Sequence, residues 1–180
     1  TLSFRFLISY NLYMVANFPY QIVAFLKDSP SIDEPVYNGS NGWYAQLALK
    51  RRFTIVDMNE DELIDKVQRY CSEIRSFSIQ IKSYVKPSRI PVGILEVCQT
   101  DELVAFHNGF IHFMDDKIIS KYPDREGVNY LPHITADYDG VDVIDRAQYQ
   151  NQDFKIESVW ILKDIGTVDS IALQPFQLVA

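Results

Sequence analysis

A short segment around His133 carries residue types that can bind a phosphate and move a proton. It reads His133-Ile134-Thr135-Ala136 and continues to Asp137. Because side chains alternate along a β-strand, His133, Thr135 and Asp137 are predicted to share one face. An imidazole beside a hydroxyl can hold a phosphate oxygen and transfer a proton near neutral pH. A His-x-Thr match also arises by chance in strands, so this segment needs support from its context.

The other two histidines, His107 and His112, lie in a predicted helix over residues 101–118. His107 shares the apolar stripe of that helix and is predicted to be packed, whereas His112 lies off the stripe and is predicted to be solvated. We therefore expect neither to be catalytic. Three scattered histidines without paired cysteine ligands predict no metal site, and we expect no cofactor.

A dense basic cluster, Lys50-Arg51-Arg52, ends a predicted strand over residues 43–50. The net charge is -7 and the pI is about 4.9, so the surface does not attract nucleic acid non-specifically, and any phosphate ligand must be bound by a local basic cluster. Alternation predicts that Lys50 and Arg52 face the site and bind phosphate, with Arg51 pointing away; a solvated strand end is the alternative. The same face is predicted to carry Tyr44, which could stack on a base or bind phosphate, together with Gln46 and Ala48.

The pattern along the chain predicts one α+β unit. Hydrophobic residues make up 47% of the sequence, enough for a core. Asn59 and Glu62 form a capping-box pattern that begins a helix ending near Arg75. The remaining elements are expected to be a loop over 28–42 and strands over 20–27, 76–85, 91–98, 130–138, 153–163 and 170–178, the last two antiparallel. This order predicts two lobes of mainly antiparallel sheet with the helices packed outside and a central cleft.

The order of these motifs resembles the 2H phosphoesterase superfamily, which includes 2'-5' RNA ligase-like proteins and RNA 2',3'-cyclic phosphodiesterases. The resemblance runs from about residue 19 to the end. A helix, DELVAFHNGF, is followed by a polar loop and then by LPHITADY, as around the second His-x-Thr motif of that family. At the first motif this chain has Gln46 where the family has histidine and Ala48 where it has a hydroxyl residue.

The resemblance implies a metal-independent phosphodiesterase that acts on a 2',3'-cyclic phosphate or a 2'-5' linkage. His133 would be the surviving acid or base, Thr135 would hold the phosphate, and the site would be impaired because glutamine has no pKa near 7. A non-catalytic protein that binds RNA ends or nucleotide phosphates is the second hypothesis. An interaction protein with an aromatic N-terminal surface and an accidental motif is the third.

Residues 1–18 are predicted to be an N-terminal extension or first strand region, and residues 19–180 a single bilobal domain. Residues 1–13 could precede a natural start at Met14. The segment lacks the features of a signal peptide, and the apolar runs are too short to span a bilayer, so we expect a cytoplasmic protein with no membrane partner. The sequence leaves the oligomeric state open.

Overall fold

The computed structural model describes residues 18–36, 44–88, 92–138, 140–165 and 170–180. The expectations about residues 1–13, and all but the end of the predicted region 1–18, lie outside these residues. Within them the strands form one antiparallel sheet in the order β10-β9-β1-β2-β6-β4-β3-β8, with β5 beside β2 and β7 beside β6. The strands are β1 (Tyr20–Phe25), β2 (Gln46–Ile55), β3 (Phe77–Val85), β4 (Val92–Val97), β5 (Ile118–Ser120), β6 (His133–Tyr138), β7 (Val141–Asp142), β8 (Asp153–Ile156), β9 (Ser158–Asp164) and β10 (Ser170–Gln177).

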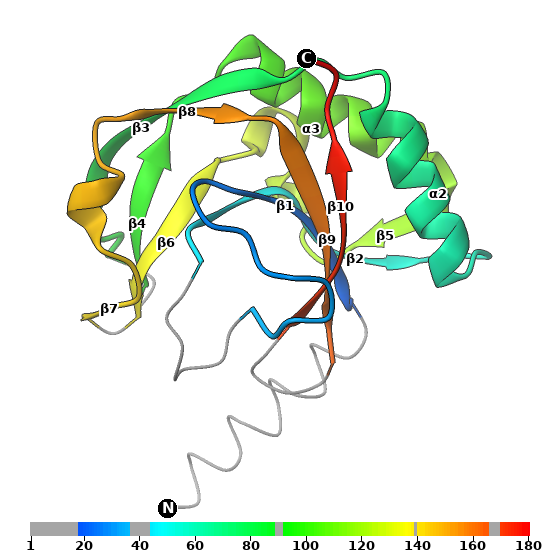
Figure 1. Cartoon of the computed structure of the whole chain (residues 1–180), viewed down its shortest axis with the longest axis horizontal. Helices are drawn as coiled ribbons and strands as arrows, with labels where there is room; N and C mark the ends of the chain where they lie inside the picture. The colour runs from blue at the N-terminus through cyan, green and yellow to red at the C-terminus, as the bar shows by residue number, and fades with distance from the viewer. Residues whose placement is uncertain (1–17, 37–43, 89–91, 139, 166–169) are drawn as a thin grey trace, which may run out of the picture.

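The sheet has two halves that meet where β2 pairs with β6. One half contains β1, β2, β9 and β10, and the other contains β3, β4, β6 and β8. The register between β2 and β6 rests on a single pair, Leu47 with Ile134, whereas the pairing within each half is longer. The strands form an arch in Figure 1. The halves therefore meet at a short central seam.

Two helices, α2 (Glu60–Cys71) and α3 (Asp101–Met114), pack on the outer side of the arch (Figure 1). The predicted capping box is confirmed: the Asn59 side chain accepts from the backbone N–H of Glu62, and the Glu62 carboxylate accepts from that of Asn59, both at 2.9 Å. Both helices turn apolar stripes to the sheet and form the main core. Its members include Leu63, Val67, Phe106, Phe110, Leu47 and Ile134.

The predicted strand over 153–163 is two strands, which corrects the expectation. Strand β8 pairs with β3 in one half of the sheet, whereas β9 pairs with β10 and β1 in the other. Glu157 lies between them and its backbone carbonyl accepts from the N–H of Leu178. The predicted antiparallel pairing of the C-terminal strands is confirmed for β9 and β10.

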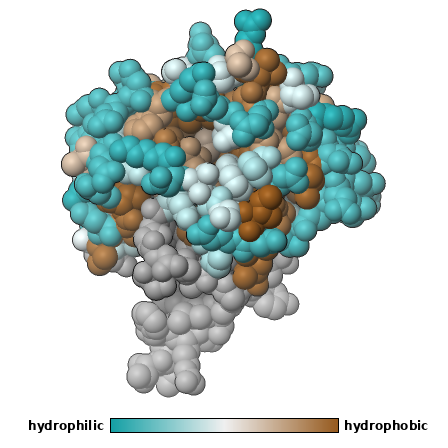
Figure 2. Space-filling model, viewed as in Figure 1, coloured by the Kyte–Doolittle hydropathy of each residue, from teal (hydrophilic) through white to brown (hydrophobic). Residues whose placement is uncertain are grey.

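The polar loop of the sequence contains short 3-10 turns, η2 (Pro123–Arg125) and η3 (Gly127–Asn129), between β5 and β6. Figure 2 shows that the face turned to the viewer is mostly hydrophilic and is interrupted by separate hydrophobic patches. None of the helices in the described part of the chain has the length and apolar character needed to cross a membrane.

Candidate active site at the seam between the two halves

The seam brings the two predicted motif segments side by side. Leu47 and Ile134 are both fully buried in the core that lies under the helices. Because neighbouring residues in a strand point to opposite faces, the residues on either side of this pair lie on the inner face of the arch. The antiparallel register sets Gln46 opposite Thr135 and Ala48 opposite His133. Residues opposite each other in such a pair have Cβ atoms about 5 Å apart.

Gln46 has a polar atom with no partner. Its Oε1 is buried and accepts no hydrogen bond. Ala48 beside His133 supplies no polar side-chain atom. Where the resemblance implies a second imidazole and a second hydroxyl, the inner face therefore carries an amide and a methyl group.

Neither of the other histidines reaches this face, in agreement with the sequence-based predictions. His107 is buried, donates from Nδ1 to the carbonyl of Leu49 at 2.8 Å, and stacks on the ring of Tyr130 with 3.9 Å between ring centroids. Burial lowers the pKa of His107, and its Nε2 is buried without a partner. His112 is exposed on α3. His133 is thus the one of the three histidines on the inner face at the seam.

The hydrogen bonds of His133 determine which of its ring nitrogens can act as a base. Nδ1 lies 2.9 Å from the carbonyl oxygen of Leu131, which can only accept, so Nδ1 carries the proton and Nε2 has a lone pair. Nη2 of Arg51 lies 3.1 Å from both ring nitrogens. Burial, followed by the positive charge of Arg51, holds the pKa of His133 below its ordinary value. Both effects favour the neutral form of the ring.

A cavity of about 510 Å³ opens beside this imidazole. His133, Arg51, Arg125 and the amide of Asn129 supply its nitrogen-bearing groups, and Asp124 is a carboxylate in its wall. The apolar part of the wall comes from Pro87, Ile94, Val128 and Leu131. The cavity therefore offers two guanidinium groups and an imidazole beside an apolar surface.

Strand β2 corrects the predicted placement of the basic cluster. Its register with β1 shifts twice, so that Ile22 pairs with Lys50 but the next residue, Val23, pairs with Ala48. Each shift adds a residue to β2, and such a bulge interrupts the alternation of faces. Lys50 consequently points to the core side, is 0% exposed, and binds Glu126 and Ser120. The predictions that Lys50 faces the site and that Arg51 points away are both wrong.

Arg52 and Tyr44 are both engaged with carboxylates. The Arg52 guanidinium forms an ion pair with Asp164. Tyr44 donates from its hydroxyl to Oε1 of Glu34 at 2.8 Å, and this hydrogen bond is the main reason that the pKa of Tyr44 is raised. Tyr44 packs against Phe25 at the edge of the inner face. Both residues lie near the seam, and the side chain of each already binds a carboxylate.

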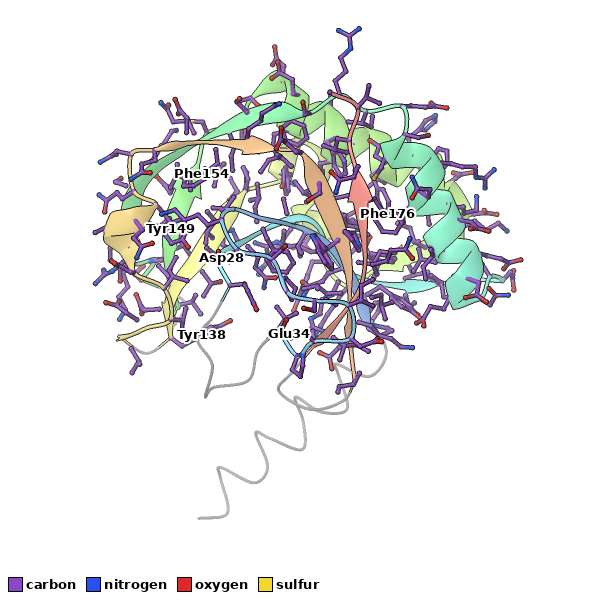
Figure 3. The ribbon with its side chains drawn as sticks, in the orientation of Figure 1. Asp28, Glu34, Tyr138, Tyr149, Phe154 and Phe176 are labelled. Atoms are coloured by element: carbon purple, nitrogen blue, oxygen red, sulfur yellow. The ribbon has the colours of Figure 1, made fainter. Side chains whose placement is uncertain are left out.

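A second shift in register, in β6, corrects the predicted position of Asp137. Gly93 pairs with Asp137 but Ile94 pairs with Thr135, so β6 has one extra residue. Asp137 is buried and accepts from the Tyr84 hydroxyl at 2.6 Å instead of lining the site. The residue that forms a side-chain hydrogen bond with Thr135 is Tyr138. Figure 3 shows Tyr138 at the end of β6.

Three residues of this site, Arg51, Arg125 and Tyr138, were missed by reasoning from the sequence. The bulges that bring in Arg51 and Tyr138 leave no sequence signal, because they arise from pairing with β1 and β4. No group of three or more His, Cys, Asp or Glu side chains that could hold a metal ion occurs in the described ranges. The arrangement can accept a proton at His133 Nε2 and hold an anion beside Arg51 and Arg125.

Comparison with known proteins finds the same fold in several solved structures. No family model matches the sequence, and no curated protein sequence matches it significantly. A crystal structure of a phosphoesterase superimposes with a TM-score of 0.57 at 13% identity, over 91% of this chain and 99% of that one. TT0787 of Thermus thermophilus gives 0.55 at 15% identity, over 89% and 97%. Escherichia coli LigT, crystallised with 3'-AMP, gives 0.54 at 12% identity, over 91% and 99%.

The structural similarity extends over nearly the whole length of both chains. At a sequence identity this low, it shows only that the fold is shared. The antiparallel sheet curved into an arch, the two helices on its outer side and the central pair of motif strands agree with the fold that the motif order implied. The chain has the fold of the 2H phosphoesterases.

Proposed function

We propose that this protein is a 2H phosphoesterase-like protein whose inner face binds a nucleotide or RNA phosphate ester. In this proposal it hydrolyses a 2',3'-cyclic phosphate or a 2'-5' phosphodiester slowly, with an impaired site. The observation that carries the proposal is the register of β2 and β6, which sets His133 and Thr135 on one face opposite Ala48 and Gln46. Support also comes from LigT, which has been crystallised with 3'-AMP, with ATP and with phosphate.

In the proposed reaction His133 is the base. Its neutral Nε2 accepts the proton of a water molecule, whose oxygen then attacks the phosphorus atom. One P–O bond forms, the ester P–O bond breaks, and the leaving oxygen takes a proton from solvent. Thr135 contributes a hydroxyl for a phosphoryl oxygen. Gln46 can orient the ester or a water molecule, but it has no proton to give near pH 7, and loss of such a partner costs about 10²–10⁴ in rate.

Phosphate contact is assigned to Arg51 and Arg125 in place of Lys50 and Arg52. Arg51 and Arg125 line the cavity, whereas Lys50 is enclosed behind the sheet and Arg52 pairs with Asp164. A guanidinium donates two parallel hydrogen bonds to a phosphate, which suits this role. Tyr44 would have to leave Glu34 before it could contact a ligand.

The test compares hydrolysis of a 2',3'-cyclic nucleotide by the wild type, His133→Ala and His112→Ala. His112→Ala is the matched control, because it removes an exposed imidazole on α3. We expect His133→Ala to lose at least about 10²-fold in rate and His112→Ala to match the wild type. Equal rates for all three proteins would reject His133 as the base.

A non-catalytic binding protein is the second candidate. It is favoured by the loss of both the imidazole and the hydroxyl at Gln46 and Ala48, with neither His107 nor His112 available as a substitute. Binding of 3'-AMP without any hydrolysis of cyclic or 2'-5' substrates would support this function over the enzymatic one. Failure to bind any phosphate ester would reject both.

A further inference from the structure

The cavity beside His133 extends away from the seam. Of the inner-face residues at the seam, His133 lines the cavity, whereas Gln46 and Thr135 do not. The volume of about 510 Å³ lies within the range of about 300–1,000 Å³ that is usual for pockets of small organic ligands. A phosphoryl group held at His133 would fill only a part of this space. The cavity therefore has room for a second, larger part of the same ligand.

The apolar part of the wall contains the two most exposed large apolar side chains in the described part of the chain. Val128 is 98% exposed and Leu131 is 70% exposed. Pro87 and Ile94 line the same cavity and are half-buried. Single exposed apolar side chains are common, but a group of them in one cavity marks a binding surface. This surface suits a flat or apolar part of a ligand.

Asp124 and Asn129 add hydrogen-bond acceptors to the cavity, and both side chains are exposed. Nδ2 of Asn129 donates to the backbone carbonyl of Asp124 at 3.0 Å, and this fixes the orientation of the amide because a carbonyl can only accept. Among the described residues, neither Oδ1 of Asn129 nor the carboxylate of Asp124 receives a hydrogen bond. The cavity thus offers an amide oxygen and a carboxylate to N–H groups of a ligand.

Arg51 and Arg125 place positive charge in the same wall. A ligand that matches the whole cavity has an anionic end, a flat apolar body and N–H donors on its edge. A nucleoside phosphate has these three parts. Of the four common bases, guanine alone carries two adjacent N–H donors, at N1 and at the 2-amino group, which a carboxylate can bind with both of its oxygens.

We propose that this cavity is a nucleobase subsite that selects guanine. The base lies against Val128 and Leu131, and its N1–H and 2-amino groups donate to the Asp124 carboxylate. The proposal deepens the proposed function and rests on it for the phosphate ester at His133. It names guanosine phosphates as the preferred ligands among phosphate esters.

The first test compares the affinities of inorganic phosphate, 3'-GMP and inosine 3'-monophosphate for the full chain by calorimetry. Inosine keeps the N1–H and O6 of guanine but lacks the 2-amino group, so the comparison isolates one donor. We expect 3'-GMP to bind at least about tenfold more tightly than the inosine nucleotide, as for loss of a hydrogen bond to a charged acceptor. Inorganic phosphate lacks the base and should bind at least about a hundredfold more weakly than 3'-GMP.

The second test removes the carboxylate. Asp124→Asn keeps the size of the side chain but leaves one acceptor oxygen, so it cannot accept from both N–H groups. The affinities of 3'-GMP and inosine 3'-monophosphate should then agree to within about twofold. Asp153→Asn is the matched control, because it removes the same charge from an exposed position on β8 and should keep the preference for guanine.

The third test removes part of the apolar wall. Val128→Ser should weaken the binding of 3'-GMP at least about threefold and leave the binding of inorganic phosphate unchanged, because only the base contacts the valine. Val141→Ser is the matched control, since Val141 lies on β7, is 69% exposed and does not line the cavity. Both side chains are exposed, so both variants should fold.

Binding that ignores the base would overturn the proposal. Wild-type protein with equal affinities for 3'-GMP and inosine 3'-monophosphate would show this, as would a Val128→Ser effect no larger than that of Val141→Ser. A guanine preference that persists in Asp124→Asn would also overturn it. If the chain binds phosphate esters and needs His133 for hydrolysis but ignores the base, the subsite fails and the proposed function stands. If it binds no phosphate ester, both fail.

Discussion

Restoring the missing motif, with Gln46→His and Ala48→Thr together, should raise phosphodiesterase activity. The register of β2 and β6 places the introduced imidazole opposite Thr135 and the introduced hydroxyl opposite His133, with Cβ atoms about 5 Å apart in each pair. The two imidazoles would then lie diagonally across the seam and could contact opposite sides of one phosphoryl group. Loss of an acid–base partner costs about 10²–10⁴, so a gain of at least about 10² is expected.

The double variant should remain folded. Gln46 Oε1 is buried without a partner, so its replacement removes an unsatisfied acceptor, and Ala48 is only partly buried. We expect the free energy of unfolding in urea to change by less than about 1 kcal/mol. The stability measurement is needed because a gain in rate can be interpreted only for a folded protein.

The pH profile supplies an independent check. Wild-type activity requires neutral His133, whose pKa is held below its ordinary value, so the rate should rise with pH through that low pKa and then level off. The introduced imidazole must be protonated to act as an acid, so the double variant should also lose rate at higher pH and give a bell-shaped profile. The assay follows 2',3'-cyclic nucleotide hydrolysis, with His133→Ala in the double variant as the control. A folded double variant that binds 3'-AMP like the wild type but hydrolyses no faster would refute the inferred geometry.

Two further predictions test the packing that holds the site in place. Glu126→Ala should lower the free energy of unfolding by about 3–5 kcal/mol, because it leaves the fully buried Lys50 without a counter-charge. Lys50→Met should lower this free energy by less, because the Glu126 side chain is 16% exposed and can be hydrated. Urea denaturation would measure both, and a Lys50→Met protein of unchanged stability but weaker phosphate binding would instead indicate a ligand-facing lysine. Gly93→Ala should lower the melting temperature, because its Cβ would overlap Oδ2 of Asp137 and force that buried carboxylate away from Tyr84, whereas an unchanged melting temperature would contradict this packing.

Most of the helices and strands could be predicted from local sequence patterns. The capping box at Asn59 began the first described helix where predicted, and apolar periodicity placed α3 and most of the strands. These signals depend on neighbours within a few residues, so they survive in a single sequence. The division of the segment 153–163 into β8 and β9 was missed, because each piece pairs with a different half of the sheet.

The candidate site could be predicted from the sequence only in part. The segments of Gln46 and His133 were identified from residue types, but the face on which Arg51 and Asp137 lie was not. Alternation along a strand holds only while the register is constant, and the register shifts in both β2 and β6. A single extra residue in one strand exchanges the faces of all residues beyond it.

The sequence by itself therefore determined the kinds of groups available: one imidazole beside a hydroxyl, an amide and a methyl group at the partner positions, and a basic cluster nearby. The tertiary structure decided which basic side chain of that cluster contacts His133. Lys50 is enclosed with Glu126, Arg52 is paired with Asp164, and Arg51 lies against the imidazole. The physical reason is that the direction of a strand side chain depends on pairing with partner strands, and those partners are distant in the chain.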